Sequence, residues 1–245
     1  MMKTKLLYLE EFTLLESPAR VAEVLRENDR DVVVLDQTVF YPQGGGQPYD
    51  TGVIESPSGK LLVEEVRFAE GVVWHMGVFE SGSFAAGESV ICRVDADRRL
   101  LHARIHSAGH LVDKAVAELG LPWRPGKGYH FPQGPYDEYE GNLDGFDKEK
   151  LKNDLERLCN TYILAGGKTE IIFMTREEMQ KTCRYTPDFP MEKGERARVI
   201  IHAGFAMPCG GTPVADLADI GPITIRKIKQ EKDKIRIGYD VSHER

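Results

Sequence analysis

Two histidines and one cysteine are the residues of this sequence best suited to chemistry. His106 and His110 lie in the stretch 101–119, where apolar residues recur at spacings of four and three. This period predicts an amphipathic helix, and residues four apart share one of its faces. Cys209 stands before two glycines, in a loop whose backbone can approach a metal closely. The three side chains form a two-imidazole, one-thiolate set, typical of catalytic zinc with one position left open.

Each part of this set also has a purely structural interpretation. The two histidines can lie on the polar face of a helix, and the cysteine can be buried in a tight turn. His102, one turn before His106, adds a third imidazole to the same face. Gly109 weakens a helix by about 1 kcal/mol relative to alanine, but it lets another backbone or a substrate approach closely. Only the combination of the motifs favours a metal site.

A glycine loop is the third candidate for function. The segment 40–52 contains three successive glycines, Gly44, Gly45 and Gly46, followed by Gln47. Successive glycines permit positive φ and expose backbone N–H groups to a ligand. The loop is not a phosphate loop, because no Gly-Lys-Ser/Thr follows it, and it is not the dinucleotide fingerprint. From these residues alone it is either a turn between strands or a ligand-binding loop.

The elements that must position these residues change character near residue 95. Before it, short β-branched runs at 32–35, 61–63, 72–74 and 89–94 predict a small barrel or sandwich. After it, Asp95 or Asp97 caps the helix that Gly120 ends, a second helix covers 147–165, and a capping box at 175–178 opens a third. Strands are expected at 169–173, 196–201, 222–228 and 234–238. The sequence therefore predicts an α+β protein with domains 1–95 and 96–245.

Composition restricts the setting in which the protein acts. No segment approaches the ~20 apolar residues that span a bilayer, and the start turns acidic too soon for a secretory signal. Four cysteines, at 92, 159, 183 and 209, show no pairing signature, so we expect a cytoplasmic protein. The net charge of −7 argues against broad nucleic-acid binding. A local basic patch is possible at 226–236, which also fits a solvated edge hairpin.

The motifs together resemble a known family. The chain carries Gly-Gly-Gly-Gln-Pro at 44–48, His-xxx-His at 106–110 and Cys-Gly-Gly-Thr at 209–212, followed by Ile220-Gly221. A Gly-Pro-Tyr-x-Glu-Tyr-x-Gly stretch occupies 134–141. This order and spacing are similar to the editing region of alanyl-tRNA synthetases and to their stand-alone relatives, the AlaX group. The resemblance extends over nearly the whole chain.

The resemblance implies an N-terminal β-barrel-like domain and a C-terminal α/β editing domain with a zinc site. It implies an aminoacyl-tRNA deacylase that hydrolyses the ester joining serine or glycine to tRNA(Ala). His106, His110 and Cys209 match the family's metal ligands. Gly44, Gly45, Gly46 and Gln47 match a loop near the amino-acid pocket. Zinc could polarise the ester carbonyl, lower the pKa of a bound water or orient the substrate.

One position departs from the family pattern. Pro213 stands where the family has a histidine that acts as fourth ligand, and proline cannot ligate. Either the fourth position is open to water or substrate, or another residue fills it, for which His102, His130 and Cys183 are the candidates. Two other functions stay open: a metal-free tRNA-binding protein without hydrolysis, and a zinc hydrolase of small esters or amides.

Overall fold

The structure, a computed structural model, describes residues 3–186 and 188–242. Its contacts divide the chain into two compact units, Met1–Leu101 and His102–Arg245. The division falls inside the first α-helix, α1 (Ala96–Glu118), a few residues beyond the predicted boundary. The assignment of separate roles to 1–95 and 96–245 stays a prediction.

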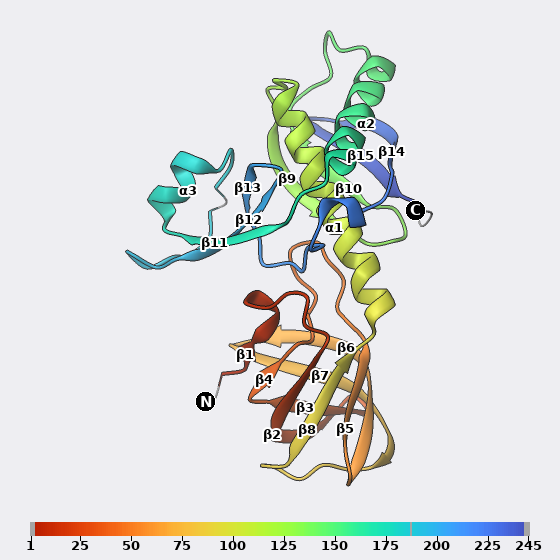
Figure 1. The fold of residues 1–245 in the computed structure, drawn as a ribbon, viewed down its shortest axis with the longest axis vertical. Helices are drawn as coiled ribbons and strands as arrows, with labels where there is room; N and C mark the ends of the chain where they lie inside the picture. Colours follow the sequence, from red (N-terminus) through yellow and green to blue (C-terminus); the bar gives the residue numbers. More distant parts are fainter. Residues whose placement is uncertain (1–2, 187, 243–245) are drawn as a thin grey trace. The chain divides into compact units, whose positions relative to one another are not determined.

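The first unit is a closed antiparallel barrel of six strands (Figure 1). Asn28 and Asp29, both at positive φ, form the tight turn between its first two strands, a conformation that matches the twist of a hairpin. Val33, Ile54 and Leu61 belong to the buried interior. In order around the barrel the strands are β2 (Glu16–Glu27), β3 (Arg30–Leu35), β7 (Val72–Gly82), β6 (Gly59–Ala69), β5 (Gly52–Ser56) and β8 (Ser89–Val94).

A short N-terminal segment lies alongside the barrel strands in the same unit. β1 (Lys5–Leu6) pairs in parallel with β4 (Gln37–Thr38), and the 3-10 turn η1 (Leu7–Leu9) follows β1. The hydroxyl of Thr4 donates a hydrogen bond to the Leu35 carbonyl at 2.9 Å and accepts one from the Val73 N–H at 3.1 Å. These bonds attach the start of the chain to β3 and β7.

The second unit contains a four-stranded antiparallel sheet with two helices against it. Along β15, alternate residues Ile235, Ile237 and Tyr239 are fully buried, and the Tyr239 hydroxyl donates to the Ile105 carbonyl of α1. The side chain of Asn160, from α2 (Lys148–Ala165), bonds both backbone groups of Ile223 in β14. The strand order is β14 (Ile223–Glu231), β15 (Lys234–Val241), β10 (Tyr136–Glu140) and β9 (Arg124–Tyr129).

A smaller three-stranded sheet carries the rest of the second unit. Its order is β11 (Glu170–Met174), β12 (Ala197–His202) and β13 (Phe205–Pro208). The short helix α3 (Arg176–Thr182) packs on it through Met179, which joins Cys183, Val199 and Ala206 in an apolar cluster. The 3-10 turn η2 (Leu217–Asp219) follows before β14.

The predicted α+β fold class is confirmed. The predicted N-terminal caps of the three helices are confirmed as well. The Asp95 side chain, not that of Asp97, accepts from the Arg98 N–H, while Asp147 caps α2 and the box at Thr175 and Glu178 caps α3. The sequence missed β2, β5, β9, β10 and β13, as well as the two-residue strands. Two of these strands are hidden by their composition: β9 contains Pro125 and two glycines, and β10 contains three acids. They form because β10 pairs with β15 and β9 pairs with β10.

The basic stretch 226–236 forms the β14–β15 hairpin, with β14 at the sheet edge. Lys234 and Arg236 both pair with Glu138, and Arg226 pairs with Asp240. Much of its positive charge is therefore paired with acidic residues of the same four-stranded sheet. No helix among residues 3–186 and 188–242 has the length and apolar character to cross a membrane.

Candidate metal centre

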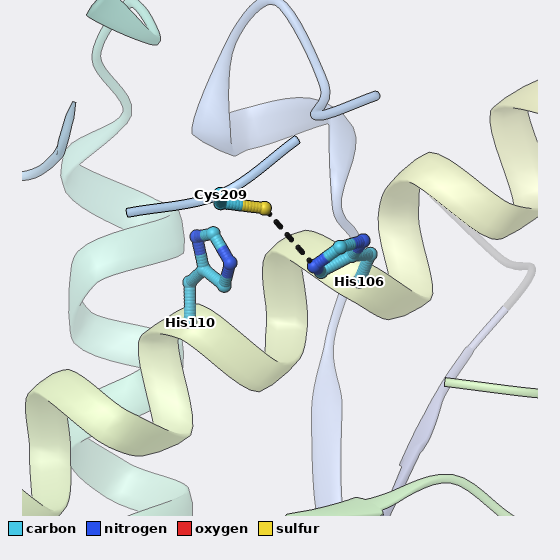
Figure 2. A group of neighbouring side chains, drawn as sticks. All are labelled: His106, His110 and Cys209. Carbon is cyan, nitrogen blue, oxygen red and sulfur yellow. Dashed lines mark hydrogen bonds between the residues drawn. The ribbon is translucent and has the colours of Figure 1, made fainter. Parts of the chain in front are cut away.

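Three potential ligands from separate parts of the second unit meet at one point. His106 and His110 project from α1 toward Cys209, which directly follows β13 (Figure 2). One ligand atom from each lies within 4.8 Å of the other two. Cys209 Sγ is 3.4 Å from His106 Nε2, and the two imidazole rings are perpendicular, with centroids 5.0 Å apart. Such an arrangement can hold one metal ion.

Burial keeps both imidazoles in the form that binds metals. His106 and His110 are each 5 % exposed. Burial lowers the pKa of both rings well below the usual value of 6.5, and neighbouring imidazoles and Arg198 lower it further. The rings are therefore neutral at neutral pH, with a lone pair available on each. An ion would meet no proton competition from them.

The loop that carries Cys209 is held by Arg198 of β12. Arg198 Nη1 donates to the carbonyls of Cys209 and Gly211, at 2.8 and 2.9 Å, while the Cys209 N–H donates to the Arg198 carbonyl. The Val214 N–H donates to Ser107 Oγ at 3.1 Å, which attaches the end of the loop to α1. These hydrogen bonds to the backbone of the loop fix the position of the thiol relative to the two imidazoles.

The thiol needs a cation to become a ligand. Burial raises the pKa of Cys209 above 9.0, against the opposing effects of the Gly211 N–H, 3.3 Å from Sγ, and of Arg198. A bound divalent ion would stabilise the thiolate, since thiolates and not thiols ligate metals. Two neutral imidazoles and a thiol within mutual reach fit a borderline-soft metal such as zinc.

Two further imidazoles, those of His130 and His202, lie next to the two ligand histidines. The His130 ring stacks on His106 with centroids 4.4 Å apart, and the His202 ring lies 5.2 Å from that of His110. Burial lowers the pKa of His130 to about 3 and that of His202 to about 4. Pro213 is buried beside the cysteine loop.

None of the three residues predicted as possible replacements for the family's fourth ligand belongs to the group of His106, His110 and Cys209. Cys183 belongs to the apolar cluster under α3, and His102 and His130 are not among the three grouped ligands. Sequence reasoning missed His202. The available signal was its place at the end of the expected strand 196–201, directly before the Ala203-Gly204 turn that leads back to Cys209.

Gly109 lets side chains, rather than another backbone, approach α1 closely. A Cβ at this position would lie 2.6 Å from His130 Cε1 and 2.9 Å from the Tyr239 hydroxyl. His130 Nδ1 and that hydroxyl are 2.7 Å apart, so the pair forms one buried unit against the helix.

We expect Gly109→Ala to destabilise the protein by about 1–3 kcal/mol through overpacking, although alanine favours the helix by about 1 kcal/mol. The measurement is urea unfolding of the full chain. The double variant Gly109→Ala, His130→Ala serves as the control, because it removes the ring that the new methyl group meets. A gain in stability for Gly109→Ala alone would contradict the close packing.

The glycine loop is a tight turn in the first unit. Gly45 and Gly46 have φ of 53° and 79°, and the backbones of Gly44 and Gln47 bond each other at 3.2 and 2.9 Å. The Tyr41 hydroxyl donates to the Gly44 carbonyl at 2.8 Å. A Cβ on Gly45 would meet only this hydroxyl, at 3.8 Å. Space is therefore available there, and backbone conformation is the main constraint.

We expect Gly45→Val to lower stability by about 1–2 kcal/mol, the cost of a left-handed residue with a side chain, and to lower activity per folded molecule much more. Gly87→Val is a matched control, since Gly87 has φ of 84° in the same unit and open space around it. Equal activity of the two variants would identify the loop as a turn only.

Comparisons with known proteins identify the family to which this chain belongs. The family model described as tRNA synthetases class II (A) matches residues 5–98. The chain is 34 % identical over 231 residues to the alanyl-tRNA editing protein AlaX-M of Pyrococcus horikoshii, covering 93 % of this chain and 91 % of that protein.

Longer relatives match over a part of their length. The alanine–tRNA ligase of Thermococcus kodakarensis is 35 % identical over 237 residues and that of Methanospirillum hungatei 30 % over 243 residues. Each match covers 95 % of this chain and 25 % of the ligase. The chain belongs to the family of AlaX-type alanyl-tRNA editing proteins, homologous to the editing region of alanyl-tRNA synthetase.

Proposed function

We propose that this protein is a trans-editing deacylase that hydrolyses the ester of tRNA(Ala) mischarged with serine or glycine, using zinc at His106, His110 and Cys209. The observation that carries the proposal is the convergence of these three ligand atoms within 4.8 Å, in a chain that belongs to the editing family. Acting on charged tRNA, such an enzyme would work in the cytoplasm.

The chain's own residues define what this site does. The two buried neutral imidazoles and the thiol lie within reach of one point, and a zinc ion held there would polarise the ester or orient the substrate. An aminoacyl ester is intrinsically labile, so positioning and electrostatic stabilisation supply a large part of the required acceleration. Arg198, buried and anchored on the cysteine loop, adds fixed positive charge beside the site.

The second part of the proposal concerns recognition of the substrate. We propose that Gly44, Gly45, Gly46 and Gln47 contact the amino-acid end of the tRNA. Support comes from Gly45 and Gly46, which have positive φ and carry no side chain that could shield their N–H groups. Gln47 is fully buried and bonds the backbone of Gly44, so it holds the end of the turn. The Tyr41 bond to Gly44 fixes the conformation of the loop before any substrate binds.

The test is a deacylation assay with tRNA(Ala) charged with serine, glycine or alanine. We expect the first two to be hydrolysed much faster than the third, with activity lost after chelation and restored by zinc. A free serine ester without tRNA is the control for a small-ester hydrolase. Binding of charged tRNA without hydrolysis, in protein that contains zinc, would contradict the proposed enzyme.

A further inference from the structure

The proposed zinc site lacks a residue for one coordination position. His106, His110 and Cys209 supply three ligands, and the buried Pro213, four residues after the cysteine, has no donor atom in its side chain. Zinc in proteins is almost always four-coordinate, with water or a fourth side chain completing the set. Which of the two completes this site depends on the buried groups that surround it.

His202 lies on the face of β12 that fronts the site. Side chains alternate along a strand, so His202 shares its face with Arg198, which binds the Cys209 loop, whereas Val199 and Ile201 face the apolar cluster. His202 is 1 % exposed, and its ring is tilted by 50° to that of His110. The lone pairs of two rings tilted in this way can converge on one ion.

Hydrogen bonding determines which nitrogen of His202 carries the proton. The Thr169 hydroxyl donates its hydrogen to the Val214 carbonyl at 2.6 Å. Its oxygen, 3.3 Å from His202 Nδ1, can therefore only accept, which assigns the ring proton to Nδ1. His202 Nε2 is then a bare lone pair, and it is buried without a hydrogen-bond partner among the described residues. Such a buried acceptor costs free energy unless something binds it.

His130, the other imidazole beside the group, is oriented differently. Its ring is nearly parallel to that of His106, at 18°, so the in-plane lone pairs of the two rings lie in separate planes. Its Nδ1 is bonded to Tyr239, and its Nε2 lies 2.3 Å from the position of a Cβ on Gly128. That nitrogen therefore faces the backbone of β9 and not the other ligands.

We propose that His202, through Nε2, is the fourth protein ligand of the metal held by His106, His110 and Cys209. Its nitrogen lies outside the group of atoms within 4.8 Å of one another, so its ring turns toward the ion on binding. The Thr169 hydroxyl is then the outer partner that fixes the ring tautomer, as is usual for metal-bound histidine. The inference rests on the proposed metal site, and it replaces an open position by a closed set of three nitrogens and one sulfur.

The experiment compares zinc affinity in wild type, His202→Gln and His130→Gln by competition with a chelator. Cobalt(II) is then substituted for zinc, and its visible absorption is recorded. We expect His202→Gln to weaken zinc binding by at least about 100-fold, because even loss of an outer partner costs 10–100-fold. The cobalt ligand-field bands of that variant should shift as water replaces an imidazole. His130→Gln should retain the wild-type band positions and bind zinc within about tenfold of wild type.

Three outcomes separate this inference from the metal site itself. Wild-type affinity in His202→Gln overturns the inference alone. Weakened affinity with unchanged cobalt bands also overturns it, since His202 would then act only on the surroundings of the ion. Failure of wild-type protein to bind zinc overturns both the site and its fourth ligand. His202→Asn provides a second variant, and thermal melts verify that each protein is folded.

Discussion

We expect Cys209→Ala protein to bind zinc more than about 100-fold more weakly than wild type and to lose deacylation of serine-charged tRNA(Ala) to the same extent. The thiol is the one soft ligand of the set, and it lies 3.4 Å from His106 Nε2. Its replacement leaves imidazoles only, an arrangement with less negative charge to neutralise the ion. His106→Ala and His110→Ala should have similar effects, because each removes one of three convergent ligands.

Two control variants distinguish the loss of a metal ligand from the destabilisation that any buried substitution can cause. Cys92→Ala removes another free thiol, which is buried in the barrel interior of the first unit, and His75→Gln replaces a buried histidine of the same unit. Both controls should retain about one zinc per chain by metal analysis after purification in zinc-containing buffer. Full zinc content in Cys209→Ala would remove the thiol from the site, and wild-type protein without zinc would refute the site as a whole.

The parts of the molecule that sequence predicts well are those whose causes are local. The spacing of four between His106 and His110 places them on one face of a helix, and the residues that cap α2 and α3 bond within three residues of themselves. Cys209 could be added to the pair because a cysteine before two glycines is distinctive. The family resemblance then supplied the relation between the two motifs, which are about a hundred residues apart in the chain.

The parts that sequence missed depend on distant partners. His202 acquires its tautomer from Thr169 and its position from the pairing of β12 with β13, so no motif around residue 202 marks it. The strands β9 and β10 have little β-propensity and exist because β15 pairs with β10 and β10 with β9. The role of Gly109 likewise depends on distant residues, namely His130, which directly follows β9, and Tyr239 of β15.

The largest stability effect should come from a buried ion pair in the first unit. Asp50 and Arg99 have side-chain exposures of 0 % and 5 %, and Arg99 Nε bonds both carboxylate oxygens at 3.0 Å. Arg99 Nη2 also donates to the Val39 carbonyl at 2.7 Å. The other role of Asp50 is to accept the Tyr41 N–H at 2.6 Å. The pair thus joins the start of α1 to the segment that leads into the glycine loop.

We expect Asp50→Ala to lower the free energy of unfolding by about 3–5 kcal/mol, because it leaves the Arg99 guanidinium buried without its counter-charge. Asp50→Asn should cost less, since an amide oxygen still accepts from Tyr41 and Arg99. Glu16→Ala is the control: it breaks the exposed pair with Arg93, and such surface pairs contribute little. Urea unfolding of the full chain measures all three.

The same substitutions test whether the ion pair also positions the glycine loop. Asp50 accepts the Tyr41 N–H, and the Tyr41 hydroxyl donates to the Gly44 carbonyl, so Tyr41 links the ion pair to the loop. If the loop binds the amino-acid end of the tRNA, Asp50→Asn should raise KM for serine-charged tRNA(Ala) in protein that is still folded and still binds zinc. Unchanged KM would limit the pair to a structural role, and an Asp50→Ala variant as stable as Glu16→Ala would show that Arg99 finds other compensation.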